Sequence, residues 1–419
     1  MRGPSPGSLS YIHQDSPRRG SYGQSPGPAV DFPACNRGGR ATLFESTTRG
    51  TRDSNPSTAD RLSPPVAALS ADSAPLTFFQ NASRLFDQAR QAAGSVDHDF
   101  RVGGHVIRLR SAGPALVSPL TRALAHLAVP PVTSPALTVS LWDSESTGTP
   151  ALRPSWSSDA YREHGAIEGF CDGRIYTVFQ WGAQAVSLLD VERSEALYWI
   201  KSADKVPYFE TAAPLRTILH LWFRMRHIHF VHAAAVGYPD GGVLLVGNGG
   251  SGKSTTALLC LESGLRYLAD DYCLVRTTPA PLVSSLYSSA KTWGDLLPRL
   301  PALASMVTNL DRPHDEKALY FLHEHHPALL LSECPLRAIL VPRLRSRPET
   351  TVVSAPAAAA LAALAPSTML QLPGMNETTL RGLAGLVRKV PCHYLDLGTD
   401  TAGVPAAIAR LLAEDPVRP

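Results

Sequence analysis

Apolar and polar residues first follow a regular pattern after residue 75. Apolar side chains recur at helical spacing over 76–93, which predicts an amphipathic helix. Residues 100–109 alternate like strands and carry the Gly103-Gly104 pair in the middle, which predicts a β-hairpin. Further along, the pattern predicts a helix at 118–127, a strand at 137–142 and a strand-rich run at 167–200. Together these elements predict a small α+β domain over 75–205.

The pattern changes beyond residue 206. A helix is predicted over 209–225, and after it short apolar runs typical of buried strands alternate with helical runs. The predicted strands lie at 337–341, 350–353 and 393–397, and the predicted helices at 357–365, 377–390 and 406–412. Such alternation predicts a layered α/β domain over 206–419.

Residues 1–74 differ in composition from the rest of the chain. They are rich in Pro, Gly, Ser and Arg and poor in large apolar residues, so they cannot bury enough surface to offset the entropy of ordering. We expect a disordered low-complexity tail without a function of its own. It is either a flexible extension or upstream sequence included by a wrongly chosen start.

Charge and composition narrow the class of protein. The 419 residues carry a formal net charge of only +3, and the basic residues are scattered, which argues against nucleic acid as a partner. Every apolar stretch falls short of the roughly 20 residues that span a bilayer, so no membrane span is expected. The six cysteines form no CxxC pair, which argues against a zinc site or a disulfide framework and favours the reducing cytoplasm.

A glycine-rich segment separates an apolar strand at 243–246 from a helical run that ends at Gly264. It fits the pattern GxxxxGK[ST]. Glycines let several backbone N–H groups face one phosphate, and the start of the helix adds its positive end. Lys253 can neutralise β- and γ-phosphate oxygens, and the Ser254 hydroxyl can bind Mg²⁺. We predict that ATP binds here, through Gly247, Asn248, Gly249, Gly250, Ser251, Gly252, Lys253, Ser254 and Thr255.

Asp270 and Asp271 follow at a spacing that brings them back to the loop. A helix of about 12 residues carries the chain roughly 18 Å away, and a strand of five or six residues after Gly264 runs roughly 16–20 Å back. Two adjacent carboxylates there can divide two tasks, one holding Mg²⁺ and one accepting the proton of an attacking hydroxyl. We assign Asp270 as the base and Asp271, with Ser254, as the metal ligand, although the residues alone leave this order open.

His232 lies upstream of the loop, in an apolar run that could form the neighbouring strand. A single histidine in such a run is more often a core residue than a site residue, and both interpretations stay open. His227 and His229, nearby, are weaker candidates. Lys291 and Lys317, downstream, could also reach an anionic group, but they too are weaker candidates because lysines are mostly surface residues.

The order of these features resembles that of a known family. The run His232-Ala-Ala-Ala-Val-Gly, the loop and Leu268-Ala-Asp-Asp-Tyr-Cys-Leu-Val are arranged as in the C-terminal domain of HPr kinase/phosphorylase, whose fold is related to that of phosphoenolpyruvate carboxykinase. The match is specific over 231–275. It looks most like the HPr-kinase-like proteins of peptide natural-product clusters, such as lasso-peptide clusters, in which some members phosphorylate a serine of the precursor peptide.

The resemblance implies roles for residues at matching positions. Lys253 and Ser254 match the nucleotide and metal residues, Asp270 and Asp271 match the metal and catalytic-base carboxylates, and His232 matches a histidine near that site. The sequence also departs from the HPr kinases. Thr255 stands where they have an acidic residue, and no match to their later Glu-Ile-Arg-Gly-like signature follows the aspartates. These departures argue against HPr as the substrate and against a phosphorylase reaction.

We therefore expect a P-loop kinase domain of the HPr kinase type that uses ATP and Mg²⁺ to phosphorylate a serine hydroxyl of a peptide or protein. The domain at 75–205 would either recognise the acceptor or serve only in packing. Two alternatives stay open, a kinase of a small molecule and a nucleotide-binding regulatory module with little turnover. An oligomer is possible, whereas nucleic acid and membranes are not expected as partners.

Overall fold

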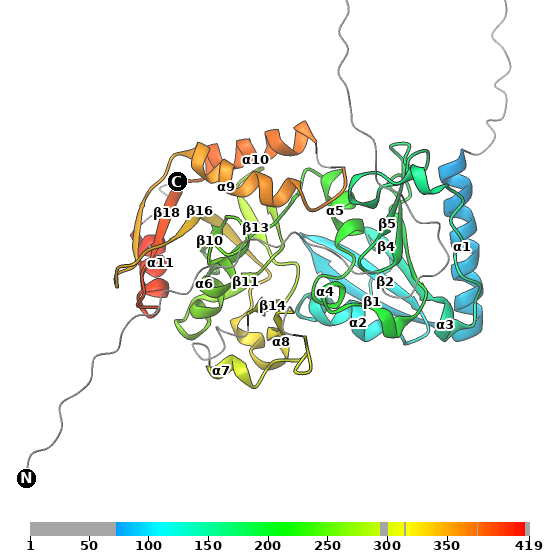
Figure 1. Cartoon of the computed structure of the whole chain (residues 1–419), viewed down its shortest axis with the longest axis horizontal. Coiled ribbons are helices and arrows are strands. Elements are labelled where there is room, and N and C mark those ends of the chain that lie inside the picture. Colours follow the sequence, from blue (N-terminus) through cyan, green and yellow to red (C-terminus); the bar gives the residue numbers. More distant parts are fainter. Residues whose placement is uncertain (1–72, 294–300, 314–315, 375, 415–419) are drawn as a thin grey trace, which may run out of the picture. The chain divides into compact units, whose positions relative to one another are not determined.

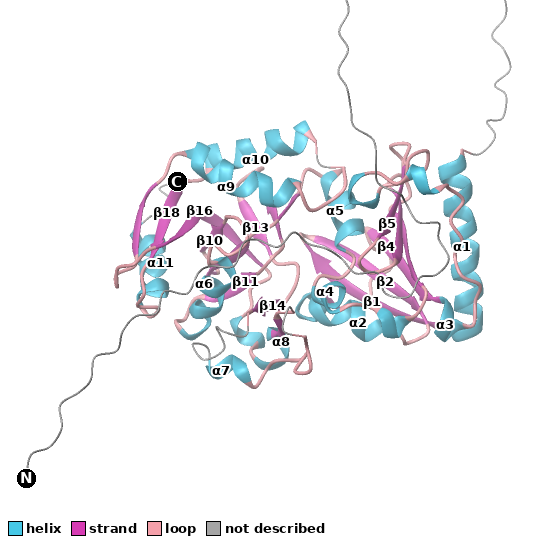
Figure 2. Ribbon diagram, viewed as in Figure 1, coloured by secondary structure: helices cyan, strands magenta, loops and turns pink. Residues whose placement is uncertain are grey.

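The computed structural model describes residues 73–293, 301–313, 316–374 and 376–414 (Figure 1). The tail predicted at 1–74 lies outside these residues except for Ser73 and Ala74. The described residues form an α/β structure with two larger mixed sheets (Figure 2). The α/β class expected from the sequence is therefore observed.

The first sheet has the strand order β3-β1-β2-β4-β7-β6-β5. Its strands are β1 (Ser95–Val102), β2 (His105–Ala112), β3 (Ala128–Val129), β4 (Leu137–Asp143), β5 (Ile175–Gln180), β6 (Ala185–Asp190) and β7 (Glu195–Ile200). The hairpin predicted around Gly103-Gly104 is confirmed, because β1 and β2 pair antiparallel and both glycines have positive φ angles. β2, β4 and β7 run parallel to one another, which makes the sheet mixed.

Helix α1 (Ala74–Ala93) lies along this sheet (Figure 1) and confirms the helix predicted at 76–93. It packs through the side chains of Phe78, Phe79 and Phe86 into a cluster of aromatic residues. The ring of Phe86 meets that of Trp142 from β4 at a centroid distance of 6.0 Å. Edge-to-face contacts of this kind add to the stabilisation from burial.

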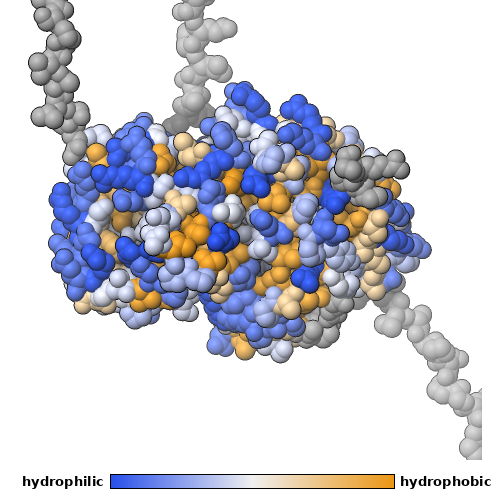
Figure 3. All heavy atoms as spheres, turned by 180° about the vertical axis from the view of Figure 1, so that it is seen from behind, coloured by the Kyte–Doolittle hydropathy of each residue, from blue (hydrophilic) through white to orange (hydrophobic). Residues whose placement is uncertain are grey.

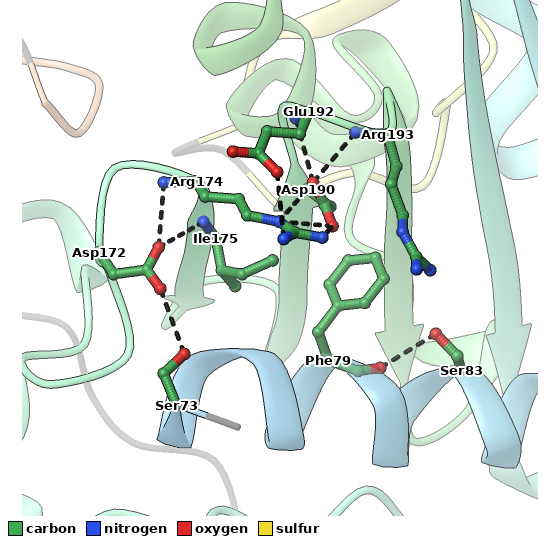
Figure 4. Close-up of polar contacts among 9 residues, drawn as sticks. All are labelled: Ser73, Phe79, Ser83, Asp172, Arg174, Ile175, Asp190, Glu192 and Arg193. Carbon is green, nitrogen blue, oxygen red and sulfur yellow. Dashed lines mark hydrogen bonds and ion pairs between the residues drawn. The ribbon is translucent and has the colours of Figure 1, made fainter. Parts of the chain in front are cut away.

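Two aspartates stabilise the turns beside α1 through hydrogen bonds and an ion pair (Figure 4). Asp172 accepts hydrogen bonds from the backbone N–H groups of Arg174 and Ile175 and, at 3.4 Å, from the Ser73 hydroxyl that precedes α1. Asp190 is fully buried and forms an ion pair with the Arg174 guanidinium at 2.9 Å. Because a buried carboxylate is costly without partners, these contacts fix the turn between β6 and β7 as well as the start of β5.

The prediction of a single helix at 209–225 is wrong. The structure has two helices there, α4 (Tyr208–Ala212) and α5 (Arg216–Arg224). Pro214 lies between them, and Leu215 has a left-handed backbone conformation with φ 57°. Proline has no N–H to donate and disfavours helical geometry in the residue before it, so the helix ends at Ala212 and a new one begins.

The second sheet has the order β11-β9-β10-β16-β13-β12-β8, and β18 pairs with both β16 and β17. Its strands are β8 (His229–Val231), β9 (Ala234–Tyr238), β10 (Gly241–Leu245), β11 (Arg266–Ala269), β12 (Cys273–Arg276), β13 (Leu282–Ser284), β16 (Glu333–Leu344), β17 (Thr351–Ser354) and β18 (Cys392–Leu397). β16, β17 and β18 confirm the strands predicted in the C-terminal part. β14 (Ser289–Thr292) and β15 (Ala318–Phe321) form a separate ribbon that the sequence pattern did not predict.

The remaining helices lie beside the strands of the two sheets (Figure 2). The longer ones are α6 (Lys253–Leu259), α9 (Ala357–Met369), α10 (Glu377–Lys389) and α11 (Gly403–Glu414), and the short ones are α2 (Val117–Thr121), α3 (Ser144–Thr147), α7 (Pro301–Ala304) and α8 (Leu322–His325). The helix predicted at 118–127 is α2 continued by a 3₁₀ turn, Arg122–Leu127. α9, α10 and α11 confirm the three predicted C-terminal helices within a few residues.

One hydrophobic core cluster contains residues from both sides of position 206. Phe100 and Leu124 from the first region share it with Tyr287 and Phe321 from the second. The guanidinium of Arg122 also lies over the ring of Phe321, 4.1 Å from its centroid. The division into domains at 75–205 and 206–419 stays a prediction, and the contacts across it are extensive.

The surface carries scattered hydrophobic side chains. On the face opposite to that of Figure 1, hydrophobic residues form patches among hydrophilic ones (Figure 3). The most exposed large ones in the described ranges are Leu310, Leu344 and Leu370. None of the helices in the described part of the chain is both long and apolar enough to cross a membrane.

Candidate functional site

The glycine-rich loop connects the end of β10 to the start of α6. Gly250 and Gly252 have φ angles of 79° and 98°, a region that side chains disfavour. A Cβ atom on Gly252 would lie 2.9 Å from Cδ1 of Leu397 at the end of β18. Glycine is therefore favoured at this position by its backbone geometry, while the end of the Leu397 side chain would have to shift to admit a Cβ atom.

Lys253 is the first residue of α6, and its side chain folds back over the loop. Its Nζ donates hydrogen bonds to the carbonyl oxygens of Gly247 at 2.7 Å and Asn248 at 3.2 Å. Burial lowers the pKa of Lys253, while the charges of Asp270 and Asp271 act in the opposite direction. The ammonium group is thus held at the loop, close to two carboxylates, in the position from which a short movement would bring it to an anion on the loop.

Asp270 returns to the loop as the spacing predicted. β9 pairs antiparallel with both β10 and β11, so β11 runs in the same direction as β10 and ends at the same edge of the sheet. There Oδ1 of Asp270 accepts a hydrogen bond of 2.8 Å from the Ser254 hydroxyl. Asp270 is only 3% exposed, and burial, together with the charge of Asp271, raises its pKa.

Asp271 has a different environment from its neighbour. Its backbone is in the left-handed region with φ 63°, a conformation that costs free energy and is concentrated at functional sites. Its carboxylate forms an ion pair with Nζ of Lys291, and Nε2 of His232 lies 3.8 Å from Oδ1. Burial alone would raise the pKa of Asp271, but Lys291 and His232 lower it well below its ordinary value. Asp271 is therefore held ionised.

His232 does not lie within a strand beside the loop, as the sequence had suggested. The apolar run is divided into β8, which pairs with β12, and β9, which pairs with β10, and His232 occupies the step between them. The adjacent residue Ala233 donates its N–H to the carbonyl oxygen of Asp271 at 3.1 Å. This backbone contact places the imidazole next to Asp271, so the histidine belongs to the site's surroundings and not only to the core.

The weaker candidates divide into two groups. Lys291 reaches the site from β14, and its N–H lies 3.5 Å from Oδ2 of Asp270. Lys317 is near enough for its charge to lower the pKa of Lys253, although burial has the larger effect. His229 instead packs against Gly382 of α10, and in the part of the chain that the structure describes His227 makes no hydrogen bond or ion pair with the aspartates.

Two further residues surround the site and were missed by sequence reasoning. The ring of Tyr272 lies 5.6 Å from that of His232, and its hydroxyl donates a hydrogen bond of 2.6 Å to Oε1 of Gln371. Gln371 follows α9, far away in the sequence. Only the position of Tyr272 directly after the aspartate pair could have drawn attention to it.

Oxygen atoms of Ser254 and Asp270 are suitable ligands for Mg²⁺. Within the described ranges, no group of three or more His, Cys, Asp or Glu side chains could hold a metal ion alone. Mg²⁺, however, is usually held by one or two carboxylates together with substrate phosphates and water. The hydrogen-bonded pair of Ser254 and Asp270 fits this limited role. The sequence had suggested Asp271 as the carboxylate that holds the metal together with Ser254, whereas in the structure Ser254 contacts Asp270.

Comparison with known proteins gives a limited result. Neither a family model nor a curated protein matches this chain. Among solved structures, the Hpr(Ser) kinase/phosphatase from Coxiella burnetii matches with 11% sequence identity and a TM-score of 0.26, over 45% of this chain and 99% of that chain.

Proposed function

We propose that this protein is an ATP-dependent kinase that uses Mg²⁺ and phosphorylates a serine hydroxyl of a peptide or protein. One observation carries the proposal. The side chains of Lys253 and Ser254 on the glycine-rich loop converge with two adjacent aspartates, and Ser254 and Asp270 are in direct contact. Phosphoryl transfer depends mainly on positioning and on neutralising charge, and these residue types supply both.

The loop and Lys253 would bind the triphosphate. On binding, the Lys253 ammonium would exchange the carbonyl oxygens of Gly247 and Asn248 for phosphate oxygens. Ser254 and Asp270 would hold Mg²⁺, which neutralises charge on the phosphates when it is bound. Asp270 suits this task because it already contacts the hydroxyl that belongs to the metal site.

Asp271 would then be the base, which reverses the order chosen from the sequence. Its carboxylate is more accessible than that of Asp270, and Lys291 and His232 keep it ionised. The serine oxygen of the acceptor forms a bond to the γ-phosphorus while the bond to the β–γ bridging oxygen breaks, ADP leaves, and Asp271 takes the hydroxyl proton. A weak base is sufficient, because the transition state of such transfers has little bond formation to the nucleophile.

A peptide or protein acceptor is supported by the resemblance over residues 231–275 to HPr-kinase-like proteins of peptide clusters. A cytoplasmic location is proposed because the six cysteines of the sequence form no CxxC pair and suggest no disulfide framework. The described cysteines, Cys171, Cys260, Cys273, Cys334 and Cys392, are all free thiols.

The test is a mass measurement on serine-bearing peptides after incubation with the purified full chain and Mg-ATP. We expect a gain of about 80 Da, the mass of one phosphate, which Asp271→Asn should abolish while ATP binding by calorimetry is retained. Arg381→Gln, on the exposed face of α10, is the matched control and should retain both. ATP binding without a product from any peptide or metabolite would refute the kinase and favour a regulatory module, whereas phosphorylation of metabolites alone would favour a small-molecule kinase.

A further inference from the structure

A small cavity is lined in part by Gln371, the residue that accepts the hydrogen bond of the Tyr272 hydroxyl. It is formed by the turn between β5 and β6, by the ends of α4 and α5 that meet at the Pro214 break, and by the segment after α9. Its volume is about 170 Å³, below the roughly 300–1,000 Å³ of sites for whole small molecules. Trp181, whose side chain is 48% exposed, marks its opening to solvent. The cavity therefore has room for one side chain.

The polar groups in this cavity are arranged for a ligand. Glu210 is completely buried and lines the cavity, and its Oε1 accepts a hydrogen bond from the N–H of Leu215. Its Oε2 has no hydrogen-bond partner among the described residues. An unpaired buried carboxylate oxygen costs free energy, and this cost would be removed by a ligand that donates a hydrogen bond.

Arg216 provides the complementary group. It lines the same cavity from the start of α5, with its guanidinium 5.8 Å from the centroid of the Phe209 ring. Arg216 is hydrogen-bonded to the Tyr272 side chain. Its charge and that of Glu210 act on each other, but no direct ion pair joins these two described residues. A ligand can therefore lie between them, with an acceptor toward Arg216 and a donor toward Glu210.

A neutral carboxamide fits both groups. A cationic side chain would be repelled by Arg216, and an anionic one would be repelled by ionised Glu210. A carboxamide donates to Glu210 when that residue is ionised and accepts from it when it is protonated, while its oxygen accepts from Arg216 in either case. Gln371, whose own oxygen is fixed by the Tyr272 hydroxyl, adds a further amide group at the wall of the cavity.

The cavity is connected to the candidate catalytic residues through one side chain. Tyr272 follows Asp271 directly, contacts the His232 ring, and reaches Gln371 with its hydroxyl. One hydrogen bond therefore joins Gln371, a residue of the cavity lining, to the residue that follows Asp271. This short chain of contacts suggests the acceptor peptide as the source of a side chain bound in the cavity.

We propose that this cavity binds the carboxamide side chain of an asparagine or glutamine that lies near the target serine of the acceptor peptide. The proposal rests on the proposed kinase function, because it takes the ligand to be the acceptor of that reaction. The binding of a capped amino acid in the cavity can nevertheless be measured without any phosphoryl transfer. The two can therefore fail separately.

The binding test uses the full chain labelled with 5-fluorotryptophan, with the Trp181 resonance assigned by Trp181→Phe. N-acetyl-glutamine-N-methylamide should shift this ¹⁹F resonance in a saturable way, and the capped leucine, glutamate and lysine should not. Glu210→Gln should weaken the binding at least tenfold. Because a change at a buried residue can disturb folding, Arg216→Gln is measured as well, and the melting temperature of each variant is checked. No shift, or equal or stronger binding of the capped leucine, glutamate or lysine, would overturn the proposal.

A kinase assay separates this proposal from the function on which it rests. Serine peptides are compared in which one neighbouring position holds glutamine or leucine. We expect the glutamine peptide to have a KM at least tenfold lower at one position, with this advantage lost in Glu210→Gln and kcat nearly unchanged. Phosphorylation that ignores glutamine at every position would overturn the cavity proposal and leave the kinase standing. A saturable ¹⁹F shift without any phosphorylated peptide would support the cavity and refute the peptide kinase.

Discussion

Replacing Lys291 by methionine should destabilise the protein through the loss of one specific ion pair. Nζ of Lys291 contacts a carboxylate oxygen of Asp271, and the two side chains are only 16% and 19% exposed. Methionine keeps much of the volume and apolar character of the lysine stem but removes the charge. The variant therefore leaves the Asp271 carboxylate largely buried without its partner.

The size of the effect follows from burial. Removing one partner of a buried pair costs about 3–5 kcal/mol, and unit charges 4 Å apart attract by about 4 kcal/mol at an effective dielectric constant of 20. Both side chains retain some access to water, so we expect a smaller loss than for a fully buried pair, about 2–3 kcal/mol at pH 7. The folded-state pKa of Asp271 is depressed, so the contribution of the pair is present above the unfolded-state pKa. It is lost only as the pH falls further, toward the folded-state value.

The assay is a double-mutant cycle measured by urea unfolding at pH 7. Lys291→Met should cost about 2–3 kcal/mol in the wild-type background and much less when Asp271→Asn is already present, which gives a coupling of about 2 kcal/mol. Arg381→Gln breaks an exposed pair with Glu377, whose side chains are 68% and 83% exposed, and should change stability by at most about 0.5 kcal/mol. A coupling below about 0.5 kcal/mol would show that the pair contributes nothing specific.

Three further predictions concern the loop and a buried histidine. Lys253→Ala should weaken Mg-ATP binding about 10–100-fold by calorimetry, since a charge-assisted hydrogen bond is worth about 1.5–3 kcal/mol; unchanged affinity would exclude Lys253 from the nucleotide site. Gly252→Ala should lower stability by about 1–3 kcal/mol in urea, because its φ of 98° is one that side chains disfavour. Burial lowers the pKa of His126 to about 3, so its contribution to stability is complete above pH 6.5 and is lost as the pH falls toward 3. Between pH 6.5 and 5 the wild type should lose about 2 kcal/mol more than His126→Gln, and parallel pH profiles would contradict this.

The position of the glycine-rich loop between a strand and a helix, and the return of the aspartates to it, could be predicted because both depend on local spacing. A strand, a glycine turn and a helix follow one another directly, and the length of helix and strand decides where Asp270 lies. Its contact with Ser254 is the result of that geometry. The end of the helix before Pro214 could also have been predicted, since the proline is visible in the sequence.

The remaining parts of the site come from distant positions. Lys291 reaches Asp271 only because β14 pairs with β15 into a ribbon beside the sheet, and such short strands carry little periodic signal. Gln371 reaches Tyr272 across 99 positions of the chain. Arg216 and Glu210 face one cavity because the helix is broken between them. Contacts of this kind depend on tertiary packing, which periodicity does not encode.

The hydrophobic core that crosses position 206 restricts how this protein can be divided. A shortened chain that begins there would turn Tyr287 and Phe321, both fully buried, toward water and would lose the ion pair between Arg122 and Glu324. Such a fragment would be expected to aggregate when produced alone. The same constraint would apply in evolution, where the region that carries the glycine-rich loop could not be exchanged between genes without the first sheet, whose residues share this core.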